Sequence, residues 1–322
     1  MRFVIVGAGA VGGVVGARLY QAGFGVTLIA RGAHLEAIER GGLRLETPAE
    51  RVVLRIPVTG SAGAIEWRED HAALVFTKSQ DTLTALLELR AAAPPDVPVV
   101  CVQNGVENER LALRLFAEVY GAVVMTPVAH LEPGVVQAYG TSLTGYIDIG
   151  RYPSGVDGVC EQVSAALRGS GFGSAARPDI MRLKYAKLLT NLGNAVDALC
   201  KPGPDSERLI ELARAEGRAA LRASAIDYAA PEVDDVGARW KRMGVRPIGD
   251  RSRPGSSTWQ SIARGARAVE TDYLNGEVVL LGRTNGVPTP VNELLCRLAS
   301  RHAAQGMGPG TLASQQVLAE LR

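Results

Sequence analysis

The chain has 322 residues, a length that predicts about two domains of roughly 150 residues each. Hydrophobic residues make up 47% of it and charged residues 21%, which are ordinary proportions for a globular protein with apolar cores. The formal net charge is only +2, so we expect no nucleic-acid partner and no membrane partner.

Neither the cysteines nor the histidines form a recognisable framework. The four cysteines are widely spaced without a C-x-x-C pair, and the four histidines lack metal-ligand spacing. The histidine spacing leads us to expect no metal. Because a chain of this size does not need disulfides for its stability, we expect reduced cysteines and a cytoplasmic location. The apolar stretch at residues 3–17 is too short to span a bilayer and contains five glycines, so we predict no targeting or spanning segment.

The N-terminus predicts a strand, a glycine-rich turn and a helix. Residues 2–6 are rich in β-branched side chains, which is typical of a buried strand. G-A-G-A-V-G at residues 7–12 follows and opens a helix that ends near Ala22, before Gly23. Residues 25–29 predict a second strand. Together these segments predict a βαβ unit of about thirty residues.

Strands and helices continue to alternate after this unit. We expect strands at 72–76 and 97–102 and helices at 81–92 and 107–119. This alternation predicts an α/β fold with a Rossmann-type doubly wound parallel sheet. Residues 43–58 and 122–149 contain short strands and turns, from which we expect antiparallel additions at one edge of the sheet.

Helical segments dominate after residue 177. The expected helices cover 179–199, 206–228, 233–243, 256–283 and 290–302, and the tail after Gly306 is expected to be mobile. The sequence therefore predicts a Rossmann-type domain at residues 1–177 and an all-helical domain at residues 178–322.

The G-x-G-x-x-G motif predicts a dinucleotide site because it follows a strand and opens a helix. Gly7 permits the tight turn, Gly9 lets the backbone approach the pyrophosphate, and Gly12 lets the helix pack on the strand. The cofactor-binding backbone comprises Gly7, Ala8, Gly9, Ala10, Val11 and Gly12. The alternative is a glycine-rich junction that binds nothing.

Arg31 indicates which dinucleotide is bound. NAD sites usually place a carboxylate after the second strand to bind the ribose, whereas Ala30-Arg31-Gly32 offers a guanidinium that can pair with a 2′-phosphate. We therefore predict NADP(H), with a solvated surface Arg31 as the alternative. Lys78, Gln103 and Asn104 follow the next expected strands and are further candidates to contact the cofactor, although Asn-Gly can also be simple turn chemistry.

Several motifs along the chain are similar to those of the ketopantoate reductase family. They are G-A-G-A-V-G, A-R-G, K-S-Q-D-T, Q-N-G, K-L-L-T-N and a late S-S…E-T-D-Y-L-N-G, in this order over nearly the whole chain. The resemblance implies a Rossmann domain followed by an all-helical domain. It also implies NADPH-dependent reduction of 2-dehydropantoate to pantoate, a step of pantothenate and coenzyme A biosynthesis.

Lys187, Asn191 and Asn194 share one face of the expected helix at about 100° per residue. Buried polar groups need partners, which a substrate carboxylate and hydroxyls would provide, whereas a solvated polar face is the alternative. By resemblance, Lys187 is the general acid, and Asn191 and Asn194 orient the substrate, to which Asn104 can also contribute. The family places the second asparagine eight residues after the lysine, where this chain has Ala195. Lys184 is an alternative acid.

By resemblance, Ser257 binds the substrate, and Glu270 acts near the reacting centre, where its charge would keep Lys187 protonated. Ser261 stands where the family usually has aspartate, and the spacing from Ser257 to Glu270 is one residue longer than expected. Asp272 and Asn275 can also be helix-surface or packing residues.

These departures keep other functions open. The chain could reduce a different 2-keto acid, or act as a non-catalytic NADP-binding sensor. A 3-hydroxy acid or polyol-phosphate dehydrogenase shares the two-domain plan and a helical lysine. Apolar faces in residues 270–281 can pack within the chain or against a second copy, which leaves a homodimer open.

Overall fold

The structure, a computed structural model, describes residues 1–230 and 236–321 and divides them into two compact units. The first unit contains residues 1–103, 107–183 and 236–253, and the second contains 104–106, 184–230 and 254–321. These units differ from the expected division at 177/178, mainly because residues 236–253 belong to the first one.

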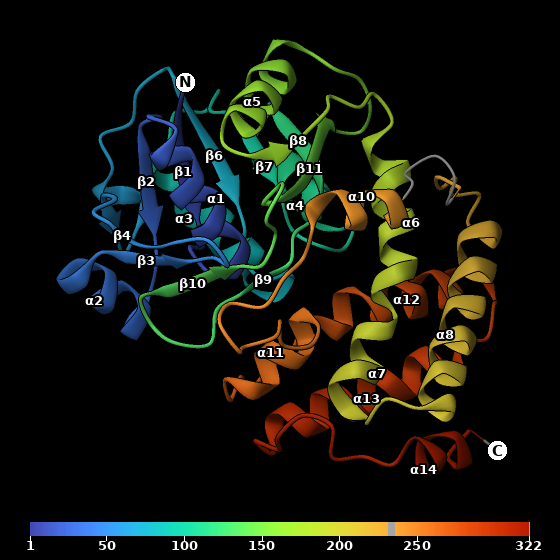
Figure 1. Cartoon of the computed structure of the whole chain (residues 1–322). Coiled ribbons are helices and arrows are strands. Elements are labelled where there is room, and N and C mark those ends of the chain that lie inside the picture. The colour runs from blue at the N-terminus through green and yellow to red at the C-terminus, as the bar shows by residue number, and fades with distance from the viewer. Residues whose placement is uncertain (231–235, 322) are drawn as a thin grey trace. The chain divides into compact units, whose positions relative to one another are not determined.

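The first unit is built on a mostly parallel sheet with the strand order β12-β11-β8-β7-β6-β1-β2-β5 (Figure 1). Its strands are β1 (Arg2–Val6), β2 (Val26–Ile29), β5 (Val58–Thr59), β6 (His71–Val75), β7 (Val99–Cys101), β8 (Val119–Met125), β11 (Gly145–Arg151) and β12 (Phe172–Gly173). All neighbours are parallel except β8 and β11. The Rossmann-type fold is thus confirmed.

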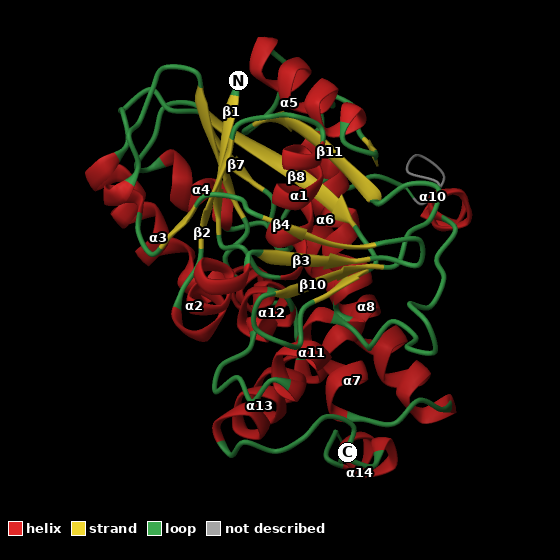
Figure 2. Ribbon diagram, turned by 60° about the vertical axis from the view of Figure 1, so that its left-hand side comes forward, coloured by secondary structure: helices red, strands yellow, loops and turns green. Residues whose placement is uncertain are grey.

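A second sheet, with the order β4-β3-β10-β9, also belongs to the first unit (Figure 2). It comprises β3 (Leu43–Glu46), β4 (Arg51–Leu54), β9 (Val128–Ala129) and β10 (Val135–Ala138). The expectation of antiparallel additions at one edge was therefore right only for β11. The other strands form a separate sheet because they pack against α1 (Ala10–Gln21). This helix is buried on most of its circumference and contacts β3, β9 and β10.

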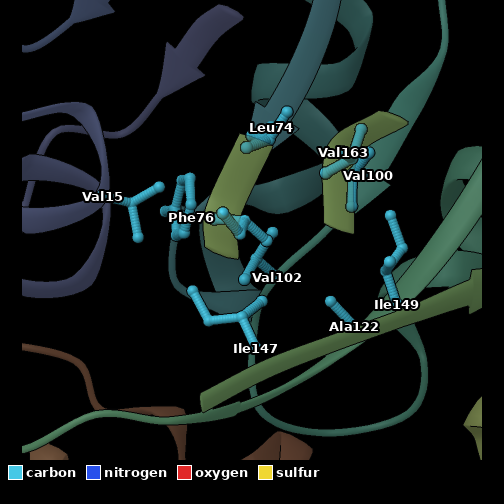
Figure 3. A pocket seen from close by; sticks show the side chains of 10 residues that line it. Val15, Leu74, Phe76, Val100, Val102, Ala122, Ile147, Ile149 and Val163 are labelled. Carbon is cyan, nitrogen blue, oxygen red and sulfur yellow. The ribbon is translucent and has the colours of Figure 1, made fainter. Parts of the chain in front are cut away.

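Alternate residues of the central strands serve two cores. Phe3 and Ile5 of β1 join the cluster under α1 and α5 (Gly158–Gly169), whereas Val4 and Val6 join the cluster under α3 (Ser79–Ala92) and α4 (Asn108–Leu113). Figure 3 shows apolar side chains of the first cluster, where the remaining space is too small for a water molecule. Helices thus cover both faces of the sheet, as a doubly wound fold requires. The unit also contains α2 (Gly32–Gly41) and the short η1 (Ala62–Ala64).

Residues 236–253 are fixed to the first unit by polar contacts. Arg239 of α10 (Val236–Met243) donates to Asp148 at 2.7 Å and lies over the ring of Tyr146, with 4.9 Å from its guanidinium carbon to the ring centroid. Arg251 donates to the buried carboxylate of Glu46 at 2.7 Å. These long-range pairs explain why the segment leaves the expected helical domain.

The second unit is all-helical, as predicted. Its elements are α6 (Ile180–Asn191), α7 (Gly193–Leu199), α8 (Pro204–Ala223), α11 (Ser257–Ala263), η2 (Glu270–Tyr273), α12 (Asn275–Asn285), α13 (Pro290–Ala304) and α14 (Ser314–Ala319), with the division between the units falling inside α6. Their apolar faces form one cluster that includes Leu192, Leu209, Val278 and Leu295. None of the helices in the described ranges is long and apolar enough to cross a membrane.

Several predicted helices are shorter or interrupted. The helix expected at 256–283 is divided because Gly265 has a φ of +74° and its N–H donates back to Ile262, a common way to end a helix. The helix expected at 107–119 ends at Leu113, that at 206–228 ends at Ala223, and residues 233–235 lie outside the described residues.

The tail after Gly306 was wrongly expected to be mobile. It forms α14, from which Val317 packs into the helical core with 2% exposure. Backbone N–H groups of Gly310 and Leu312 donate to the carbonyls of Ala198 and Leu199 at 2.9 Å each. The tail is therefore part of the second unit's core.

Candidate active site

The three motif glycines have environments that suit a dinucleotide loop. Gly7 has a φ of +96°, which favours glycine. A Cβ on Gly12 would lie 2.2 Å from the carbonyl oxygen of Gly7, so only glycine fits there. A Cβ on Gly9 would meet no atom within 4 Å, which leaves open space beside the backbone.

The start of α1 offers hydrogen-bond donors to an anion. Gly9 precedes the helix and supplies no side-chain cap. The first backbone N–H groups of a helix, here those of Ala10, Val11 and Gly12, have no acceptor within the helix. Such donors, together with the helix dipole, suit a pyrophosphate. The loop geometry therefore fits the dinucleotide predicted from the sequence.

A cavity of about 390 Å³ adjoins this loop within the first unit. The charged or titratable side chains that line it are Arg31, His34, Lys78, Asp81 and Glu88. Arg31 extends to α3, where its Nη2 lies 2.8 Å and 2.7 Å from the two carboxylate oxygens of Glu88. Arg31 is thus held at the cavity by a carboxylate 57 residues away in the sequence, which the sequence did not predict.

His34 is a second residue that the sequence did not predict for this site. Its Nδ1 accepts a hydrogen bond from the backbone N–H of Gly134 at 2.9 Å, which assigns the proton to Nε2. Nε2 then donates to the carbonyl of Ala8 at 2.8 Å. His34 therefore ties the glycine loop to the turn before β10. Only its position three residues after Arg31 could have indicated such a role.

Gln103 fastens neighbouring loops of the first unit. Its side-chain amide donates to the hydroxyls of Thr82 at 3.1 Å and Thr77 at 3.4 Å, and the residue is only 5% exposed. A direct contact of Gln103 with a cofactor remains a prediction. Asn104 is partly buried and precedes Gly105, whose φ of +81° places a tight turn there.

In the second unit, Lys187 and Asn191 lie one turn apart on α6. Lys187 is partly buried, and Asn191 is 5% exposed. The Asn191 side-chain nitrogen is buried without a hydrogen-bond partner among the described residues. Leaving such a donor unsatisfied costs about 1–3 kcal/mol, which a hydrogen bond to a bound ligand or to water would remove. Lys184, the alternative acid, is more deeply buried at 3% exposure.

An interruption of the helix separates Asn194 from Lys187 and Asn191. The sequence predicted one continuous helix, whereas α6 ends at Asn191 and α7 begins at Gly193. The backbone carbonyl of Asn194 accepts a hydrogen bond from the Ser256 hydroxyl at 3.3 Å. The role assigned to the Asn194 side chain therefore stays a prediction.

Ser257 is the first residue of α11, and its position is fixed by its neighbours. The Ser256 hydroxyl caps the helix by accepting from Trp259 N–H at 3.2 Å, and the Ser256 N–H donates to Asp197 at 2.7 Å. The Ser257 hydroxyl oxygen is buried without a partner in the described part of the chain. Sequence reasoning missed Asp197, which lies 59 residues before Ser256.

The last motif of the sequence covers the short η2 segment and the start of α12. Glu270 begins η2 and is 4% exposed. Asn275 is fully buried and donates to the Leu192 carbonyl at 3.1 Å and to Asn292 at 2.9 Å, so it is a packing residue, whereas Asp272 is exposed. Asn275 therefore fixes α12 to the break between α6 and α7.

These features define a class of protein. A glycine loop at a Rossmann strand–helix junction, followed in the chain by a helical unit with a lysine and buried polar donors, is typical of two-domain dehydrogenases that use a nicotinamide dinucleotide. In the residues that the structure describes, no group of side chains could hold a metal ion.

Comparison with known families identifies the particular family. The model of "Ketopantoate reductase PanE/ApbA" matches residues 3–154, and that of its C-terminal domain matches residues 179–303. The chain belongs to the ketopantoate reductase family, and it is an oxidoreductase acting on CH–OH groups with a nicotinamide cofactor. The resemblance noted in the sequence is thus confirmed.

Similar proteins match along nearly their whole length. The 2-dehydropantoate 2-reductase of Archaeoglobus fulgidus is 31% identical over 92% of this chain and 96% of its own. The corresponding protein of Pyrococcus horikoshii is 28% identical over 96% and 99%. The structure of a PanE/ApbA family ketopantoate reductase from Ralstonia eutropha has a TM-score of 0.78 at 29% identity, covering 95% of this chain and 99% of that one.

One structural neighbour has a different name. D-mandelate dehydrogenase, in a ternary structure with NADH and anilino(oxo)acetate, has a TM-score of 0.80, with 95% of this chain and 99% of that one covered. Its sequence identity is only 21%, so this likeness concerns the fold alone.

Proposed function

We propose that this protein reduces 2-dehydropantoate to pantoate with NADPH. The observation that carries the proposal is that two predicted substrate-binding side chains, Asn191 and Ser257, each have a buried polar atom without a hydrogen-bond partner among the described residues, Nδ2 and Oγ respectively. Both groups can donate hydrogen bonds, as a carboxylate and a carbonyl oxygen require. The similar proteins named 2-dehydropantoate 2-reductase support the choice of substrate.

Residues 1–177 would bind the cofactor and residues 178–322 the substrate. The glycine loop would hold the pyrophosphate at the start of α1, and the Arg31 guanidinium would pair with the 2′-phosphate. Lys78 lines the same cavity and would add positive charge. When bound, the reduced nicotinamide supplies a hydride. Arg31 is the reason to assign NADPH over NADH.

Lys187 is the proposed general acid. Hydride addition to a ketone carbon leaves negative charge on the oxygen, which an ammonium can stabilise and protonate. Asn191, one turn further along α6, would orient the substrate from the same helix face. A negative charge at Glu270 would favour the protonated form of Lys187.

Alanine substitutions at Asn191 and Ser257 test whether these two buried polar side chains bind the substrate. Each loses a hydrogen bond to a charged substrate, so KM for ketopantoate should rise about tenfold or more. The Kd of NADPH, measured by fluorescence titration, should stay unchanged. Thr190→Ala is the matched control because Thr190 is exposed and adjacent to Asn191. Unchanged KM in both variants would rule out the proposed substrate site.

A different 2-keto acid is the second candidate substrate. Ala195 stands where the family pattern has its second asparagine, and an interruption at Leu192 separates Asn194 from the helix that carries Lys187 and Asn191. The similarity in fold to D-mandelate dehydrogenase keeps aryl substrates open. The kcat/KM values for ketopantoate, a linear 2-keto acid and an aryl 2-keto acid identify the preferred substrate as the one with the highest value. Tight NADPH binding without any turnover would instead indicate a sensor.

A further inference from the structure

The Arg31–Glu88 ion pair lies at the place proposed above for the 2′-phosphate of the cofactor. Both side chains line the cavity beside the glycine loop, and they are half-exposed, at 57% and 44%. Arg31 uses only Nη2 in this pair, and within the described ranges its Nη1 and Nε have no hydrogen-bond partner. The guanidinium can therefore accept a second anion while Glu88 remains in place.

Nearby carboxylates would weaken the binding of a second anion to Arg31 by electrostatic repulsion. A 2′-phosphate on the guanidinium would lie close to the Glu88 carboxylate, and like charges at such short distances repel. Asp81 adds another carboxylate to the lining, so Arg31 and Lys78 are already balanced by two acidic residues. A ribose hydroxyl meets no such repulsion, because it can donate to a carboxylate, as it does in NAD sites.

We propose that Glu88 is a specificity-determining residue that narrows the preference for NADP(H) over NAD(H). It does so by sharing the Arg31 guanidinium and by placing a negative charge next to the bound 2′-phosphate. The inference rests on the proposed pairing of Arg31 with that phosphate. Glu88 acts on binding alone and takes no part in hydride or proton transfer.

Cofactor binding to the full chain tests the proposal. Fluorescence titration gives the Kd of NADPH and NADH for the wild type, Glu88→Gln and Glu88→Ala. Both variants should bind NADPH about three- to fivefold more tightly, the upper scale of an exposed ion pair, whereas the Kd of NADH should change less than about twofold or rise. Displacement of NADPH by 2′-AMP and by 5′-AMP should show the same gain for 2′-AMP alone.

Asp70→Asn is the matched control. Asp70 pairs with Arg2 at 3.3 Å with similar exposure, at the start of β1 and outside the cavity lining. This variant loses the same charge and should leave both Kd values unchanged. Unchanged thermal unfolding of the Glu88 variants would show that they fold.

The outcomes separate this inference from the proposed cofactor. If Arg31→Ala weakens NADPH but neither Glu88 variant alters its Kd, the role of Glu88 is overturned and the NADPH assignment stands. If the wild type prefers NADH but both Glu88 variants still tighten NADPH, the assignment of NADPH fails and Glu88 remains the selectivity residue.

Discussion

Residues of the candidate site are held in place by local and by long-range interactions. The environments of Gly7 and Gly12 arise from the local strand–turn–helix geometry of the motif. Glu88, His34 and Asp197 act through contacts with segments 57, 100 and 59 residues away, which no local pattern records. Local sequence patterns therefore predicted the conformation of the glycine loop, but none of these three long-range contacts.

Replacing Lys187 by alanine should lower turnover of any true substrate by at least about 100-fold, because the general acid is lost. The Kd of NADPH, measured by titration, should remain unchanged. Lys201→Ala, at an exposed lysine, is the control and should turn over normally. Near-normal turnover of Lys187→Ala would move the acid to Lys184 or to water.

Replacing Arg31 by alanine should weaken NADPH more than NADH, because only NADPH carries the 2′-phosphate that the guanidinium would bind. The comparison of the two Kd values checks this. Arg40→Ala, at an exposed arginine of α2, should change neither. Equal weakening of both cofactors by Arg31→Ala would refute the assignment of the 2′-phosphate.

At the scale of elements, the sequence predicted the type of most helices and strands better than their limits. No proline and no positive-φ glycine indicates the break between α6 and α7 in the sequence. Leu192, the residue at the break, keeps helical angles, with φ −59° and ψ −24°. Buried Asn275 donates to the Leu192 carbonyl at this break, a tertiary contact that local propensity does not contain. By contrast, Gly265 is a residue type that commonly ends a helix, so the end of α11 could have been predicted from the sequence.

The start of α5, which the sequence did not predict, gives a stability prediction. Asp157 caps α5 by accepting from Val159 and Cys160 N–H at 3.0 Å and 3.1 Å, and it pairs with Arg151 at 2.6 Å. Asp157→Ala should therefore lower the free energy of unfolding by about 1–2 kcal/mol near neutral pH. Asp96→Ala, at an exposed aspartate, should cost little.

This loss should depend on pH. Burial raises the pKa of Asp157, but the Cys160 N–H and the Arg151 guanidinium outweigh it, so the pKa lies below its usual value. The stabilisation is therefore present above the unfolded-state pKa of about 4 and disappears as the pH falls through the lowered folded-state value. Thermal unfolding across this range should show wild type and Asp157→Ala converging in acid. A constant difference would contradict the charged cap.

At the scale of the whole molecule, composition and periodicity predicted an α/β part followed by a helical part. They did not predict that residues 236–253 return to the first unit. The pairs that hold this segment there, Arg239 with Asp148 and Arg251 with Glu46, join positions 91 and 205 residues apart. Family membership agrees with the two-part plan, because the two family models match residues 3–154 and 179–303.

Steady-state reduction of ketopantoate by the wild-type protein, followed by the loss of NADPH absorbance, is the measurement that decides whether the proposed substrate is right. We expect rapid turnover with a kcat/KM of about 10⁴ M⁻¹s⁻¹ or more, and a lower value with NADH. Absence of turnover with ketopantoate, in a protein that still binds NADPH and reduces another 2-keto acid, would contradict the proposed substrate.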